Sequence, residues 1–194
     1  MANTRGAFRQ TWTAVRALLV FTLALGVVYP AVITLAALVA PSSDVRVDGE
    51  VVGSSLIGQP FTDADGNALP EWFQSRPSAA GYDAAASSGS NYGPENPDLI
   101  KAIKERKAQI AKFDGVSESD VPADAVTGSG SGLDPDISEA YALIQVNRVA
   151  TTRGLDAAAV KSLVEQHVEQ RVLGYIGEPV VNVVELNLAV AKLG

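Results

Sequence analysis

The longest uncharged stretch of the chain runs from residue 17 to residue 40, and the only charges before it come from Arg5, Arg9 and Arg16. A helix rises about 1.5 Å per residue and crosses a hydrocarbon core about 30 Å thick in about 20 residues. We therefore predict a single transmembrane helix over residues 17–40. No second uncharged stretch of comparable length follows it.

The charges that flank this stretch predict its orientation. The first acidic residue is Asp44, so nothing offsets the arginines before the helix. Because positive flanks stay cytoplasmic, we expect residues 1–16 in the cytoplasm and residues 41–194 outside a bacterial-type inner or plasma membrane. A cleaved signal peptide is the alternative, but its apolar region is usually about 7 to 15 residues long, well short of this stretch.

Small residues line one face of the predicted helix. Thr22, Gly26, Pro30 and Thr34 follow one another at intervals of four, and Tyr29 adds a large amphipathic side chain beside Pro30. Proline lacks a backbone donor, so a kink is expected there. Small side chains let another helix approach closely, so this face predicts packing against a partner helix. The alternative is a membrane anchor that packs on no partner helix, in which the small residues occur by chance.

Hydrophobic spacing after the membrane segment predicts one α+β domain. Short apolar pieces around Val45 and Val51 are typical of a hairpin, and a loop of about 40 residues follows from Gly58. Caps and apolar stripes predict three helices, over residues 97–112, over residues 134–153, and from the cap Asp156 to an inward-facing Val172. The alternation over residues 180–190 predicts a final strand with Val184, Leu186, Leu188 and Val190 inward and Asn187 outward.

Composition and charge exclude several classes of partner and site. The formal charge of −7 includes three N-terminal arginines, so the rest of the chain carries −10. Such an acidic surface makes nucleic acid an unsuitable partner. The chain has no cysteine, so disulfides and thiolate metal sites are excluded.

Candidate chemistry is sparse. Two Gly/Ser loops, residues 87–91 and 127–132, each precede a predicted helix, where backbone N–H groups can cradle an anion. They lack the lysine and hydroxyl of a phosphate loop, so a turn that lets two elements pack is the simpler interpretation. His167 is the only histidine, and no second ligand can be nominated for it. We expect no catalytic residue and no metal or cofactor site in this chain.

Several motifs resemble one family along nearly the whole chain, the C subunit of the potassium-transporting Kdp ATPase. They are Tyr29-Pro30, the runs 72–82 and 87–97, the runs 121–127 and 129–138, Gln145, residues 148–150, and the run 177–188. The resemblance implies a non-catalytic accessory subunit of a complex that imports potassium with ATP. The implied partners are a channel-like A subunit, a P-type ATPase B subunit and a small F subunit within the lipid membrane.

The resemblance also implies a second role, that of a catalytic chaperone that raises the ATP affinity of the B subunit. Ser129, Gly130, Ser131, Gly132 and Gln145 match the positions assigned to nucleotide contact in that family. The orientation expected from the arginines places these residues outside the cell, away from ATP. Assembly with the membrane partners is therefore the preferred function, and an anchored extracytoplasmic binding module is a further alternative.

Overall fold

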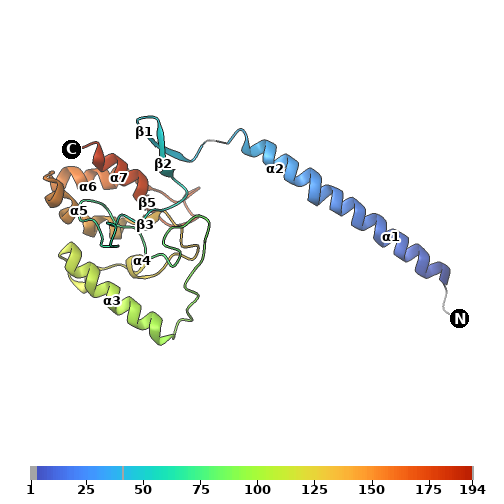
Figure 1. The fold of residues 1–194 in the computed structure, drawn as a ribbon, viewed down its shortest axis with the longest axis horizontal. Coiled ribbons are helices and arrows are strands. Elements are labelled where there is room, and N and C mark those ends of the chain that lie inside the picture. The colour runs from blue at the N-terminus through green and yellow to red at the C-terminus, as the bar shows by residue number, and fades with distance from the viewer. Residues whose placement is uncertain (1–3, 41, 194) are drawn as a thin grey trace. The chain divides into compact units, whose positions relative to one another are not determined.

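A computed structural model describes residues 4–40 and 42–193 (Figure 1). The chain divides between Ser42 and Ser43 into two compact units. The first is helical and the second mixes helices with short strands, so the predicted α+β class with one N-terminal membrane-spanning candidate is confirmed.

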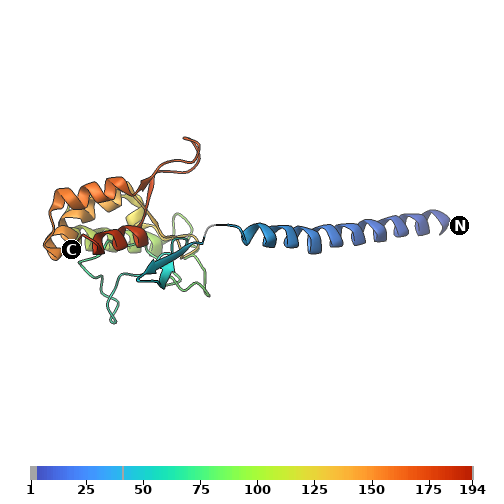
Figure 2. The same ribbon diagram turned by 90° about the horizontal axis from the view of Figure 1, so that it is seen from above.

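The N-terminal unit is one long helix with a wider turn in its middle. Helix α1 (Thr4–Leu23) continues through a π-helical segment, Ala24–Val28, into α2 (Tyr29–Ala37). In the π segment the Tyr29 N–H donates to the Ala24 carbonyl, five residues back. Pro30 follows at once, where it has no N–H to offer. The structure thus accommodates the proline by a wider turn, and Figure 2 shows the helix running on through it.

This helix is long and apolar enough to cross a membrane. Over residues 6–37 its most apolar window has a mean hydropathy of 2.3, and 0% of that window is buried. A helix this apolar is suited to a surrounding of lipid or of a partner helix.

The second unit begins with the predicted hairpin. Strands β1 (Asp44–Val47) and β2 (Glu50–Ser54) pair in antiparallel fashion. Asp48 and Gly49 connect them with φ values of 50° and 88°. Positive φ at both central residues is what a tight two-residue hairpin requires, and aspartate followed by glycine supplies it.

The long loop leads into the first domain helix as predicted. Helix α3 (Pro97–Asp114) starts at Asn96, whose side chain caps the N–H groups of Asp98 and Leu99. A 3₁₀ turn (Glu118–Asp120) and the short α4 (Ala123–Val126) follow.

Four helices and a small sheet enclose the core. Strands β3 (Asp136–Ser138), β5 (Val180–Asn182) and β4 (Val168–Glu169) lie side by side in that order, all antiparallel. Helix α5 (Glu139–Arg153) contacts α3 and α6 (Ala157–Gln166), and α6 contacts α7 (Val183–Ala191) (Figure 1). The largest fully buried side chains come from α5, α6, α7, β3, β5 and the long loop before α3, and include Phe73, Ile137, Val149, Val160, Val181 and Leu186.

Three element predictions are wrong in detail. The central helix starts at Glu139 and not near Asp134, because Asp136–Ser138 pair with β5 and Ser138 caps the helix instead. The next helix ends at Gln166. Val168 then lies in β4, and Val172 is 64% exposed instead of facing inward.

The final strand prediction is also wrong, because most of that segment is helix. Only Val180–Asn182 are strand, and α7 begins at Val183 with Asn182 as its cap. The buried residues Val183, Leu186, Asn187 and Val190 follow helical spacing. Asn187 is therefore 2% exposed and faces inward.

Candidate functional site

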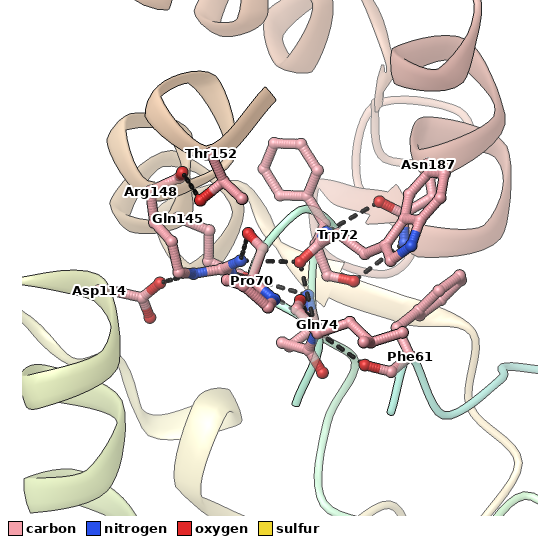
Figure 3. A network of polar contacts seen from close by, with 11 residues as sticks. Phe61, Pro70, Trp72, Gln74, Asp114, Gln145, Arg148, Thr152 and Asn187 are labelled. Carbon is pink, nitrogen blue, oxygen red and sulfur yellow. Dashed lines mark hydrogen bonds and ion pairs between the residues drawn. The ribbon is translucent and has the colours of Figure 1, made fainter. Parts of the chain in front are cut away.

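Two side-chain amides hold a segment without helix or strand, residues 70–77, in the core. We call it the irregular segment. Asn187 of α7 accepts a hydrogen bond from the Phe73 N–H (2.8 Å) and donates one to the Phe73 carbonyl (2.9 Å). Gln145 of α5 does the same for Gln74, accepting at 2.6 Å and donating at 3.2 Å (Figure 3). Each amide supplies the two hydrogen bonds that a neighbouring strand would otherwise provide. These bonds stabilise the fold, because a buried backbone group without a hydrogen-bond partner lowers the free energy of unfolding.

The Arg148 guanidinium joins the same segment to two helices. Its Nε donates to Asp114 of α3 (2.7 Å) and its Nη2 to Gln145 (2.7 Å). Its Nη1 donates to the carbonyls of Pro70 (2.6 Å) and Trp72 (2.9 Å), as Figure 3 shows. The side chains of Arg148 and Asp114 are only 6% and 2% exposed. A buried charge pair is tolerated when further hydrogen bonds satisfy it, and these do.

Aromatic rings cover the two arginines of this region. The guanidinium carbon of Arg148 lies 4.4 Å from the ring centre of Phe113, and that of Arg153 lies 4.3 Å from the ring centre of Trp72. Burial raises the pKa of Asp114, while the hydrogen bond and the charge of Arg148 act in the opposite direction. The network is thus sealed from water on several sides.

The loop at residues 129–132 is held by its own hydrogen bonds. The Ser129 N–H donates to the Pro77 carbonyl (2.9 Å). The Ser129 hydroxyl accepts from the N–H groups of Gly132 (2.9 Å) and Asp134 (3.3 Å). The Ser78 hydroxyl donates to the Gly132 carbonyl at 2.6 Å. The loop's polar groups therefore serve its own turn and the segment beside it.

The two Gly/Ser loops pack on each other. The Ser87 hydroxyl donates to the Ser131 carbonyl (2.9 Å). Gly132 has φ +71°, and a Cβ there would stand 2.6 Å from the Ser88 carbonyl oxygen and 2.7 Å from the Ala80 Cβ. This glycine is needed for close backbone approach, in agreement with the packing interpretation.

The five residues expected at a nucleotide do not form one surface. Gln145 is 0% exposed and Ser129 2% exposed, and Gly132 is buried as well. Gly130 and Ser131 are exposed at the loop tip. Gln145 and the loop contact the irregular segment at different points, Gln74 and Pro77.

Three members of the network were not expected to act together, Arg148, Asp114 and Asn187. The sequence pattern that could have identified them is a polar residue on an otherwise apolar helix face. Arg148 falls three and seven residues after Gln145 and Tyr141, which are both buried. That spacing places all three on one side of α5.

An acidic group lies where β3 begins. Burial, followed by the charges of Asp134, Glu169 and Glu185, raises the pKa of Asp136 to about 6. The folded state therefore binds a proton more tightly than the unfolded chain, and this carboxyl makes the fold less stable as the pH rises from about 4 to about 6.

His167 ends α6, with its Nδ1 at 2.8 Å from the Leu163 carbonyl oxygen. That nitrogen is therefore the protonated one in the neutral ring. Among the described residues, no three His, Cys, Asp or Glu side chains form a group that could hold a metal ion.

The helix face expected to meet a partner lies in the other unit. The Thr22 methyl is 4.0 Å from where a Gly26 Cβ would stand, and nothing else comes that close. Thr22 and Gly26 thus share a face. Tyr29 and Pro30 open α2, which also contains Thr34.

The sequence matches the family described as KdpC, K⁺-transporting ATPase, c chain, over residues 11–192. The chain belongs to the KdpC family. It is 52% identical over 187 residues to the potassium-transporting ATPase KdpC subunit of Kineococcus radiotolerans, covering 93% of this chain and 92% of the relative. The KdpC subunit of Caldanaerobacter subterraneus is 48% identical over 180 residues, 90% of each chain. That of Streptomyces avermitilis is 44% identical, covering 95% of this chain and 94% of the relative.

Family membership confirms the resemblance seen in the motifs. As a KdpC protein the chain is a subunit of a K⁺-transporting ATPase, and it carries one candidate membrane helix. Many of the motif residues, including Trp72, Gln74, Gln145 and Arg148, lie in the buried polar network of Figure 3.

Replacing the central cation tests the network. We expect Arg148→Met to lower the free energy of unfolding by about 3–5 kcal/mol, because it leaves the Asp114 carboxylate buried and unpaired. The double variant Arg148→Met, Asp114→Leu removes both charges and is expected to recover a large part of that loss. Denaturant unfolding of the full chain in detergent measures both, and an equal loss in the two variants would contradict the charge argument.

Two glycines of one loop provide a matched pair. We expect Gly132→Ala to destabilise the fold by more than about 1 kcal/mol, because its φ is positive and its Cβ would meet backbone atoms. Gly130→Ala has nothing within 4 Å, so a change within about 0.5 kcal/mol is expected. Thermal unfolding compares them. Equal effects of the two substitutions would show that close packing does not determine this loop.

Proposed function

We propose that this chain is a non-catalytic accessory subunit that assembles and stabilises the channel-like A subunit and the P-type B subunit of a potassium import complex. A small F subunit completes the set of partners. ATP and potassium are used by the complex, and this chain provides no catalytic group. Its membership of the c-chain family of K⁺-transporting ATPases supports the proposal.

The observation that carries this proposal is that buried polar side chains of the domain bond groups of the same chain. Gln145, Asn187 and Arg148 bond backbone or charged groups of the same chain. Their hydrogen bonds are therefore made within the fold itself. A domain whose polar residues hold its own backbone suits a scaffold better than a catalyst.

A role in raising the ATP affinity of the B subunit is the alternative. The exposed tip of the 129–132 loop, Gly130 and Ser131, favours a surface contact of this kind. Gln145 is fully buried and bonded at both ends of its amide. It would act in such a role only by holding the irregular segment.

We also propose that the N-terminus is cytoplasmic and that the domain lies outside the membrane. Arg9 and Arg16 precede the apolar core of the helix, and Arg5 adds a third positive charge. The positive-inside rule assigns such a flank to the cytoplasm. This orientation separates the 129–132 loop from cytoplasmic ATP and so favours the assembly role.

A bulky side chain on the small-residue face tests assembly. We expect Gly26→Leu to reduce copurification of the other Kdp subunits, because a large side chain blocks close helix approach. Within the helix a Cβ at Gly26 meets only the Thr22 methyl, at 4.0 Å, so the helix itself is not disturbed. Ala24→Leu adds a similar bulk on roughly the opposite side of the helix and serves as the control.

The outcomes separate the proposals. Copurification lost with Gly26→Leu and kept with Ala24→Leu supports the predicted face. Unaltered assembly of both variants contradicts that face. A wild-type chain that purifies alone in mild detergent contradicts the accessory-subunit function and favours an anchored binding module.

A single cysteine tests the orientation. The chain has no cysteine, so Ser131→Cys creates a unique thiol at an exposed loop position. We expect a membrane-impermeant thiol reagent to label it on intact spheroplasts. Labelling only after the membrane is opened would reverse the orientation and favour the ATP-affinity role.

A further inference from the structure

A hairpin with an apolar tip projects from the domain between β4 and β5. Figure 2 shows it leaving the body of the domain above the sheet. The tip residues Val172, Leu173, Tyr175 and Ile176 are 64%, 76%, 72% and 49% exposed. Exposed apolar side chains that gather in this way mark an interaction site far more often than scattered ones do.

The tip is held in one conformation by its own backbone. Val172 and Ile176 exchange N–H to carbonyl hydrogen bonds (2.9 and 3.0 Å), and the Gly174 N–H donates to the Arg171 carbonyl (3.0 Å). Leu173 has φ +55°, a conformation that is uncommon for any residue other than glycine. A large apolar residue that is kept in such a conformation while 76% exposed buries little surface within its own domain.

An ion pair closes the base of the tip. Arg171 and Glu178 bond each other across the hairpin, and no charged residue lies between them. The apolar tip is therefore surrounded at its base by a polar pair. An apolar centre with a polar rim is the usual anatomy of a protein interface. A tip that is already ordered also loses little conformational entropy on binding.

Charge decides between a lipid surface and a protein as the occupant. The chain beyond the N-terminal arginines carries −10, and the one cation of the hairpin, Arg171, is paired. Anionic headgroups attract basic segments and repel acidic ones, so an acidic domain that offers, among its described residues, no free cation beside its apolar tip is poorly suited to a lipid surface. An apolar recess on a protein does not require positive charge on the segment that enters it.

We propose that this hairpin tip, residues 172–176, inserts into an apolar recess on another subunit of the same ATPase complex. The inference rests on the proposed accessory function, which supplies the partner. Leu173 and Tyr175 are the most exposed of its side chains and provide most of the contact. Tyrosine in particular is enriched among the residues that dominate binding energies.

A photocrosslinking experiment on the assembled complex tests the contact. Leu173→Cys, labelled with a thiol-reactive benzophenone, is a unique probe because the chain has no cysteine. We expect illumination to link it to another Kdp subunit. Ala158→Cys, exposed in the first turn of α6, is the matched control and is expected to give no such adduct.

A pair of substitutions tests the energy of the contact. Asparagine adopts positive φ readily, so Leu173→Asn removes the apolar group without straining the turn. Combined with Tyr175→Gln, it is expected to weaken copurification of the complex by at least about tenfold. The melting temperature of the chain alone is expected to stay unchanged, because both side chains point into solvent.

Each outcome has a distinct meaning. An adduct with a partner subunit together with weakened assembly supports the inference. An adduct with lipid only, an adduct between two copies of this chain, or full assembly of the double variant overturns it while the accessory function stands. Failure of the wild-type chain to copurify with any Kdp subunit overturns the accessory function itself.

Discussion

A segment without regular secondary structure passes through the core of this domain, and its backbone polar groups have to find partners there. Phe73, at the centre of that segment, is 0% exposed. Because no strand runs beside it, the N–H and carbonyl groups of Phe73 and Gln74 are paired by the amides of Asn187 and Gln145. Helices α5 and α7 therefore hold this irregular backbone in the core through single side-chain amides.

Arg148 makes this arrangement cooperative. It bonds Asp114 on α3, Gln145 on α5 and the backbone of Pro70 and Trp72. Each bond is strong in a dry interior, and each is lost expensively if one partner is removed. Conspicuous polar residues of the family-like motifs are thus explained by the fold. A polar residue matched to a family motif can be structural, and only its burial and partners reveal which role it has.

Local signals in the sequence predicted what local physics determines. The cap at Asn96, the Asp48-Gly49 turn and the long apolar N-terminal helix depend on neighbouring residues, and the structure has all three. Helix α7 was missed because the two valine pairs at residues 180–181 and 183–184 favour a strand, although Asn182 and Glu185 form a capping pattern. The polar network was not predictable in this way. Apart from the Arg148–Gln145 bond within α5, the bonds described above join residues 34 to 114 positions apart, and no short pattern encodes such a distance.

Polar and apolar groups have exchanged their usual places in part of this chain. The interior holds an ion pair and two amides, while the long helix and the 172–176 tip present apolar side chains outward. Exposed apolar surface is unfavourable in water, and on our proposals a membrane covers the helix while a partner subunit covers the tip. Substitutions inside the network are therefore expected to act on folding, whereas substitutions on the helix face and the tip are expected to act on what the chain binds. The proposals thus assign stability and assembly to different residues.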